Sequence, residues 1–170
     1  LSDVHKLTFG ARTPRAEAAA AAVASAFEGG KFESERHGDV MLAMWEKWVF
    51  LAALAALTCL TRASVGDVMK AGGEGLSLAL QEECRAVAVA NGRVPGEAFS
   101  AMTRRRLTDP DSDLTASMLA DLEAGGPTEA EHILGDLLAR DRDGACGPAS
   151  LLRAALTAIR AQGFRAGRPS

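Results

Sequence analysis

The sequence has few of the residues that build metal sites or disulfide frameworks. Its three cysteines, Cys59, Cys84 and Cys146, are widely spaced and form no Cys-x-x-Cys pair, and its three histidines stand alone. We therefore predict no bound metal. An odd number of cysteines, two of them within apolar helical patterns, favours reduced thiols. Reduced thiols in turn indicate a cytoplasmic location rather than an oxidising compartment.

The chain also has little net charge and no apparent secretion signal. The formal net charge is −3 over 170 residues, which indicates no nucleic-acid or acidic partner. We interpret the basic run Arg104–Arg106 as a solvated helix end. Residues 1–10 carry charges and contain no long apolar core, so we expect no signal peptide. The length fits one ordinary domain with a real core.

The most apolar segment, residues 40–60, is interrupted only by Glu46 and Lys47. The uninterrupted apolar run after Lys47 is about ten residues, whereas a membrane span needs roughly 18. We therefore predict no membrane association. Because the segment is apolar on nearly every side after Lys47, we expect a helix from Val40 to Leu60 that is buried in the middle of a helical domain.

Lys47 is unusual because its neighbours three and four positions away are all apolar. Lysine is almost never fully buried without a partner. One interpretation is that its stem lies along apolar surface while the ammonium reaches water. The other is that Lys47 lies at the wall of a pocket and donates a proton. The neighbours of Glu46 are apolar too, so periodicity does not decide which of the two residues faces inward.

The chain contains no complete dinucleotide-binding fingerprint. Gly73 and Gly75 form a Gly-x-Gly pair, but Leu78 replaces the third glycine of the Gly-x-Gly-x-x-Gly pattern and no strand is expected before it. We therefore discount this segment as a phosphate-binding loop.

Turn residues and apolar periodicity predict a mostly helical domain with a small β fringe at its N-terminus. We expect strands at 5–10 and 31–36. We expect helices at 14–27, 40–60, within 63–70, at 76–90, from Pro95 to the arginines, from Ser112 or Asp113 to Glu123, from Thr128 to Arg142, and up to Gln162. Residues 163–170 are expected to form a frayed tail.

Two polar residues near the later helices have open interpretations. If Thr128 is an N-cap and Glu131 completes its capping box, Glu129 is left over at the head of an apolar stripe. Glu129 is then either a carboxylate favoured by the helix dipole or a second polar group facing the same interior as Lys47. Ser117, expected in the middle of a helix, is by itself a small packing residue.

Together these residues resemble the C-terminal domain of ketopantoate reductases (2-dehydropantoate 2-reductases). Trp45, Glu46 and Lys47 open a long apolar helix, Ser117–Met118 is followed by Asp121, and Glu129 stands twelve residues after Ser117. The segment Leu7–Gly10 resembles the last strand of that family's nucleotide-binding domain. Further matches to the family pattern are Glu83, Gly92, Gly135 and Pro148.

The resemblance implies a two-domain enzyme in which a Rossmann half binds NADPH. The helical half, similar to the C-terminal domain of 6-phosphogluconate dehydrogenase, supplies the substrate side of the active site. Lys47 matches the family's catalytic lysine, the general acid at the substrate carbonyl. Glu129 matches the family's catalytic glutamate, which helps to hold cofactor and substrate, and Ser117 matches a substrate-contacting serine.

The chain departs from the family pattern at several substrate positions. Family members usually carry asparagines four and eight residues after the lysine and three residues before the serine. These substrate-binding positions are Leu51, Ala55 and Leu114 here. Polar contacts to a hydroxylated acid are therefore missing, and we expect an altered substrate.

These observations lead us to expect the substrate-side domain of an NADPH-dependent 2-oxo-acid reductase without its Rossmann half. Residues 1–37 would be a strand–helix–strand remnant of the nucleotide-binding domain, and residues 38–162 a helical substrate and dimerisation domain. The chain alone is expected to bind no NADPH tightly and to be inactive. Its partners would be a small 2-oxo acid, the missing domain and a second copy. The alternative is a non-catalytic dimerisation or ligand-binding module that kept the fold.

Overall fold

The computed structural model describes residues 6–165 and 167. The chain divides into two compact units, and the division falls inside helix α2, between Trp45 and Glu46. The domain boundary at residues 37 and 38 stays a prediction. The elements in order are β1 Lys6–Phe9, η1 Pro14–Ala16, α1 Glu17–Phe27, β2 Glu33–Arg36, α2 Val40–Thr61, α3 Val65–Lys70, α4 Glu74–Ala90, α5 Glu97–Leu107, α6 Ser117–Glu123, η2 Glu131–Gly135, α7 Asp136–Ala139 and α8 Leu151–Arg165.

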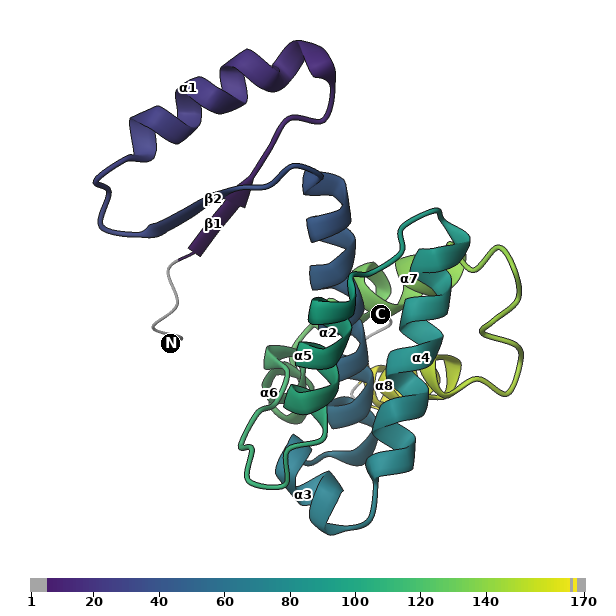
Figure 1. Ribbon diagram of the computed structural model, residues 1–170. Coiled ribbons are helices and arrows are strands. Elements are labelled where there is room, and N and C mark those ends of the chain that lie inside the picture. Colours follow the sequence, from purple (N-terminus) through teal and green to yellow (C-terminus); the bar gives the residue numbers. More distant parts are fainter. Residues whose placement is uncertain (1–5, 166, 168–170) are drawn as a thin grey trace. The chain divides into compact units, whose positions relative to one another are not determined.

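The first unit contains a β–α–β arrangement (Figure 1). Strands β1 and β2 are parallel, with Lys6 opposite Glu33 and Phe9 opposite Arg36, and α1 connects them. The strand–helix–strand order predicted from the sequence is confirmed, although His5 lies outside the described residues. The phenyl ring of Phe27 packs edge-on against Phe9 and Phe32 at 5.6 and 5.2 Å between ring centroids. Most strand residues are nevertheless exposed, which is unusual for parallel strands.

Helix α2 confirms the prediction of a long central helix and is one residue longer than expected. The Asp39 carboxylate accepts a hydrogen bond of 2.9 Å from the Leu42 N–H, as an N-cap does. Residues 52–59 are all buried. Within the described residues α2 alone is long and apolar enough to span a membrane, a test that core helices of soluble proteins also pass. The expectation of no membrane association therefore stays a prediction.

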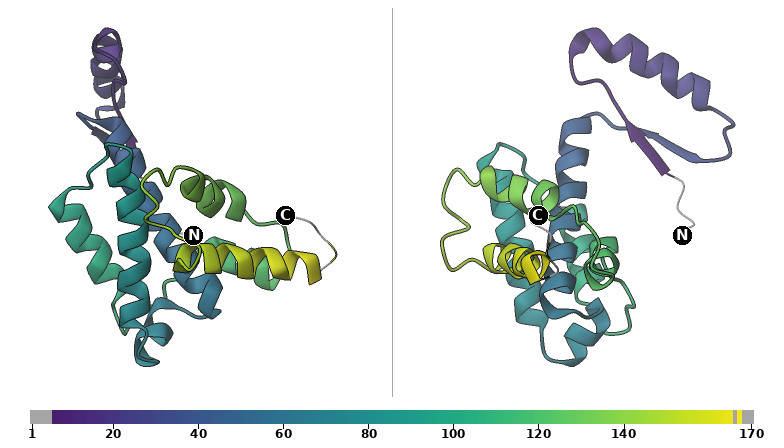
Figure 2. Two further views of the ribbon diagram at one scale, coloured as in Figure 1. Left: turned by 90° about the vertical axis from the view of Figure 1, so that its right-hand side faces the viewer. Right: turned by 180° about the vertical axis from the view of Figure 1, so that it is seen from behind.

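In the second unit, α4, α5, α6 and α8 are arranged around the C-terminal part of α2 (Figure 1). Helix α8 crosses α4, and these two helices are in contact (Figure 2). The carboxylate of Glu83 on α4 accepts hydrogen bonds from the Leu151 and Leu152 N–H groups at 3.0 and 2.9 Å. The first N–H groups of a helix have no partner within it, so Glu83 caps α8 from a neighbouring helix.

The expected helix start at Ser112 or Asp113 is wrong, because α6 begins at Ser117. The Ser112 and Leu114 carbonyls accept hydrogen bonds of 2.8 and 3.0 Å from the Gly66 and Val65 N–H groups. These donors belong to the first turn of α3 and have no partner within that helix. A Cβ atom on Gly66 would lie 2.7 Å from the Ser112 carbonyl oxygen, so only glycine allows this close approach.

The capping box at Thr128 is also wrong. The cap position before η2 is Ala130, which has no side-chain cap bond, and both Glu131 oxygens instead accept hydrogen bonds of 2.7 Å from Arg160. The segment is a π-turn followed by α7, which ends at Ala139 rather than Arg142. Helix α8 continues to Arg165, so the expected tail begins three residues too early. Residues 166 and 168–170 lie outside the described part of the chain.

All three cysteines are free and buried. Burial raises the pKa of the Cys59 and Cys146 thiols to about 11, from an ordinary value of 9.0. Burial raises the pKa of the Cys84 thiol further. The thiols are therefore protonated well above neutral pH, as expected of structural rather than reactive cysteines.

We expect Cys59 and Cys146 to react with iodoacetamide about 100-fold more slowly at pH 8 in the folded chain than in urea, because two pKa units lower the thiolate fraction by that factor. The folded thiols hold their protons more tightly than the unfolded ones. The part of the folding free energy that depends on these two thiols is thus fully present below about pH 9 and is lost as the pH rises towards 11. Peptide-resolved alkylation and urea unfolding at pH 8 and 10 test both effects. Equal alkylation rates in the two states would contradict the prediction.

Candidate functional site on helix α2

The structure shows which residue of the Glu46–Lys47 pair makes contacts within the fold. The Glu46 carboxylate accepts a hydrogen bond of 2.8 Å from the Gly96 N–H, at the start of α5. Lys47, one residue on, is exposed. A step of one residue turns about 100° around a helix, so the lysine leaves the packed side that Glu46 occupies.

Lys47, Leu51 and Ala55 follow one another at four-residue spacing and therefore share a side of α2. Lys47 and Leu51 are exposed, and Leu51 exposes 37% of its surface although it belongs to the apolar run. Ala55 is buried one turn further on. This side of α2 therefore carries the Lys47 cation, followed in the next two turns by apolar side chains.

A hydrogen bond attaches the start of α6 to α2. The Ala116 N–H donates to the Thr58 hydroxyl at 3.3 Å, and that hydroxyl donates to the Leu54 carbonyl at 2.9 Å. Ser117, exposed, is the first residue of α6 rather than a mid-helix residue. Leu114 is half-buried just before it.

A second hydrogen bond attaches the segment that contains Glu129. The indole N–H of Trp48 donates to the Ile133 carbonyl at 2.9 Å, and the Ile133 N–H donates to the Glu129 carbonyl at 2.9 Å. The guanidinium of Arg140 lies over the Trp48 ring at 5.0 Å. The Glu129 side chain is exposed, so the structure does not support the second of its two interpretations, in which it faces an interior.

The bidentate pair between Arg160 and Glu131 fixes η2 against α8. The Arg160 guanidinium lowers the pKa of the Glu131 carboxyl below its ordinary value. Glu131 is therefore fully ionised at neutral pH and remains engaged with Arg160. Glu129, two residues earlier, precedes the helical segment that this pair holds in place.

The structure thus attaches the segments of Ser117 and Glu129 to the same helix that carries Lys47. Sequence reasoning missed the residues that make these attachments, Thr58 and Trp48. A threonine within an otherwise apolar helical run was the available signal for Thr58. Gly73 and Gly75 follow α3, and no strand precedes them, as expected from the sequence. The described residues contain no group of three or more His, Cys, Asp or Glu side chains able to hold a metal.

Residues 39–160 match the protein family described as the ketopantoate reductase PanE/ApbA C-terminal domain. Among curated proteins, the chain is 28% identical over 137 residues to the uncharacterised oxidoreductase YkpB of Bacillus subtilis (strain 168). That match covers 79% of this chain and 45% of YkpB.

Among solved structures, the chain is similar to the 2-dehydropantoate 2-reductase from Methylococcus capsulatus, with a TM-score of 0.79 and 26% identity, over 98% of this chain and 53% of that one. It has the fold of the PanE/ApbA family ketopantoate reductase from Ralstonia eutropha JMP134, with a TM-score of 0.78 and 23% identity, over 97% and 53% of the two chains. The chain thus spans about half the length of these relatives.

Proposed function

We propose that this chain forms the substrate side of an NADPH-dependent 2-oxo-acid reductase. The chain belongs to the ketopantoate reductase family through its C-terminal domain. The observation that carries the proposal is that Lys47 is exposed on α2, the helix to which Thr58 and Trp48 attach the segments of Ser117 and Glu129. A cation, a hydroxyl and a carboxylate are the groups that bind and protonate a 2-oxo acid.

In the proposed reaction the Lys47 ammonium donates a proton to the carbonyl oxygen of the substrate. NADPH supplies the hydride that adds to the carbonyl carbon, and the products are a 2-hydroxy acid and NADP⁺. Reduction builds negative charge on that oxygen, so a positioned donor lowers the barrier. The Ser117 hydroxyl hydrogen-bonds the substrate, and Glu129 orients substrate and cofactor.

The residues of this chain fit one end of the cofactor only. The exposed Glu129 carboxylate can accept a hydrogen bond from a cofactor hydroxyl or amide group. The pyrophosphate needs a glycine loop between a strand and a helix N-terminus, and the sequence contains no Gly-x-Gly-x-x-Gly pattern that would supply one. The cofactor would therefore be held mainly by a Rossmann domain that pairs with this chain.

The exposed strands of the first unit support the same proposal. Parallel strands occur almost only in sheets covered on both faces, and an isolated two-stranded sheet is marginal in water. We therefore propose that β1 and β2 belong to the edge of a larger nucleotide-binding sheet.

Homodimerisation and a cytoplasmic location remain parts of the proposal. The free, buried cysteines support a reducing compartment.

We expect the dissociation constant of NADPH to be more than about 100-fold larger for this chain alone than for the full-length protein. A factor of 100 corresponds to about 2.7 kcal/mol of lost binding free energy. Isothermal titration of both proteins measures the two constants. Micromolar binding by this chain alone would mean that it holds the pyrophosphate itself and would overturn the substrate-side assignment.

We expect the full-length protein to prefer a 2-oxo acid with an apolar side chain. Leu51, Ala55 and Leu114 cannot hydrogen-bond a substrate hydroxyl. Sites that bind a hydroxyl discriminate by about 10⁴-fold or more, whereas apolar sites discriminate by roughly 10–200-fold. Values of kcat/KM with NADPH for ketopantoate, 2-oxoisovalerate and phenylglyoxylate test this expectation.

The matched variant Leu51→Asn with Ala55→Asn restores two amides to this side of α2. It should shift the preference towards ketopantoate. A wild-type protein that reduces ketopantoate efficiently and rejects both apolar acids would contradict the expected substrate. A protein that reduces no 2-oxo acid would favour the alternative of a non-catalytic module.

A further inference from the structure

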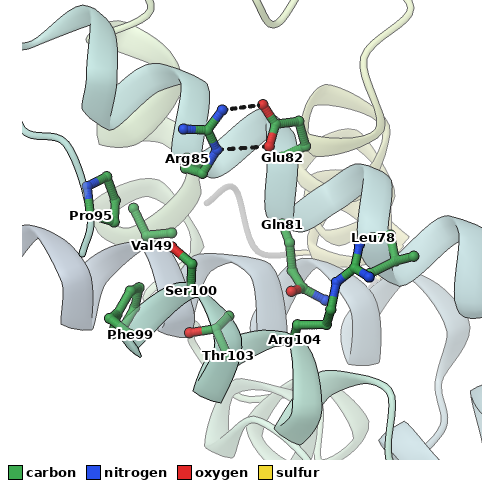
Figure 3. A pocket seen from close by; sticks show the side chains of 10 residues that line it. All are labelled: Val49, Leu78, Gln81, Glu82, Arg85, Pro95, Phe99, Ser100, Thr103 and Arg104. Atoms are coloured by element: carbon green, nitrogen blue, oxygen red, sulfur yellow. Dashed lines mark hydrogen bonds and ion pairs between the residues drawn. The ribbon is translucent and has the colours of Figure 1, made fainter. Parts of the chain in front are cut away.

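A cavity of about 220 Å³ lies between α4 and α5, away from the residues of the proposed reaction. At about 30 Å³ per water molecule it has room for a small organic molecule. Val49 contributes from α2, and it stands two residues from Lys47, so it faces nearly the opposite side of that helix. The other lining residues come from α4, from α5 and from Pro95 (Figure 3).

The cavity contains a buried polar group without a partner. Thr103 is only 4% exposed, and its hydroxyl oxygen has no hydrogen-bond partner among the described residues. Other helical hydroxyls, those of Thr58, Thr61, Ser100 and Thr108, each donate to the carbonyl four residues earlier. Because leaving a buried hydroxyl unpaired is costly, its presence in the cavity wall indicates an external partner.

The charges around the cavity favour an anion. Arg85 is engaged at one end, where its guanidinium makes two hydrogen bonds of 2.8 and 2.7 Å to Glu82 (Figure 3). The guanidinium of Arg104 lines the cavity as well and makes no ion pair or hydrogen bond within the described part of the chain. The walls between these groups include the apolar side chains of Leu78 and Phe99.

We propose that this cavity is a binding site for a small carboxylate with an apolar body. The carboxylate accepts hydrogen bonds from the Arg104 guanidinium and the Thr103 hydroxyl, while the body lies against Val49, Leu78 and Phe99. Arginine recognises carboxylates through charge-assisted, often bidentate hydrogen bonds. The site uses none of the residues assigned to the reductase reaction, so this proposal can be tested independently of that function.

The test is a titration of the ¹⁵N-labelled chain with isovalerate, followed by two-dimensional NMR. We expect saturable shifts of amide signals in α4 and α5. The Arg104→Gln variant should weaken binding by about tenfold, through loss of the charged hydrogen bonds. The isosteric Thr103→Val variant should weaken it by about fivefold. Isovaleramide, which has the same body without the charge, should bind as weakly as isovalerate binds to Arg104→Gln.

Arg105→Gln is the matched control, because Arg105 is exposed, adjacent in sequence and absent from the cavity wall. It should bind isovalerate with unchanged affinity. Three results would overturn the proposal: no saturable shift in α4 and α5, binding that is unchanged in both Thr103→Val and Arg104→Gln, or shifts confined to the residues around Lys47. In each case the cavity would hold water only.

Discussion

Replacing Lys47 with alanine in the full-length protein is expected to reduce turnover by about 10²–10⁴-fold, the usual contribution of positioned proton transfer. The melting temperature should stay unchanged, because Lys47 is exposed and the fold loses no core side chain. Lys47→Arg should not restore turnover, since a guanidinium keeps its proton at any usable pH. Steady-state kinetics beside thermal unfolding measures both effects.

Lys70→Ala is the matched control, because Lys70 is an exposed lysine in the last turn of α3. It should change neither turnover nor stability. Normal turnover in Lys47→Ala would reduce Lys47 to a solvated side chain whose stem covers apolar surface. A change in KM with unchanged kcat would assign it to binding rather than to proton transfer.

Replacing Glu83 with alanine should produce a large loss of stability. The carboxylate accepts two charge-assisted hydrogen bonds at the N-terminus of α8 and complements the positive end of the helix dipole. Hydrogen bonds to charged groups contribute about 1.5–3 kcal/mol. We expect a loss of about 3 kcal/mol, which lowers Tm by roughly 6–12 °C at this chain length.

Glu82→Ala is the matched control for Glu83→Ala. Glu82 is the preceding residue of α4, is exposed, and pairs with Arg85 at i,i+3. Such surface pairs contribute about 0.5 kcal/mol or less, so Tm should change by about 2 °C at most. Thermal unfolding followed by circular dichroism measures both variants. Equal changes in Tm would show that the cap on α8 contributes nothing beyond a surface ion pair.

Local chemistry was sufficient to predict most elements. The apolar run after Lys47 predicted α2 to within one residue. The helix expected at 76–90 ends at Ala90, two residues before Gly92, whose φ is +71°. The predictions failed where the backbone bonds to distant parts of the chain. Residues 112–114 form no helix, and the Ser112 and Leu114 carbonyls bond to the first turn of α3 instead. The Glu131 carboxylate pairs with Arg160 rather than capping its own helix.

The candidate site, too, could be predicted from the sequence only in part. The residues of the site could be named from the sequence, because the resemblance rests on residue types and spacing. Their exposure and attachment could not, since both depend on hydrogen bonds between segments far apart in the chain. Trp48 and Ile133 are 85 residues apart, and Thr58 and Ala116 are 58 apart.

The sequence by itself determined that the chain is mainly helical, is centred on one apolar helix and belongs to one enzyme family. Periodicity and residue spacing are local properties, so they can be read without coordinates. Only the tertiary structure decided that Glu46 rather than Lys47 is engaged by α5, that Glu83 caps α8, and that Thr103, with its unpaired hydroxyl, is one of the residues lining a cavity. Each of these depends on which helix face meets which neighbour, and a one-residue step of about 100° exchanges a packed position for an exposed one.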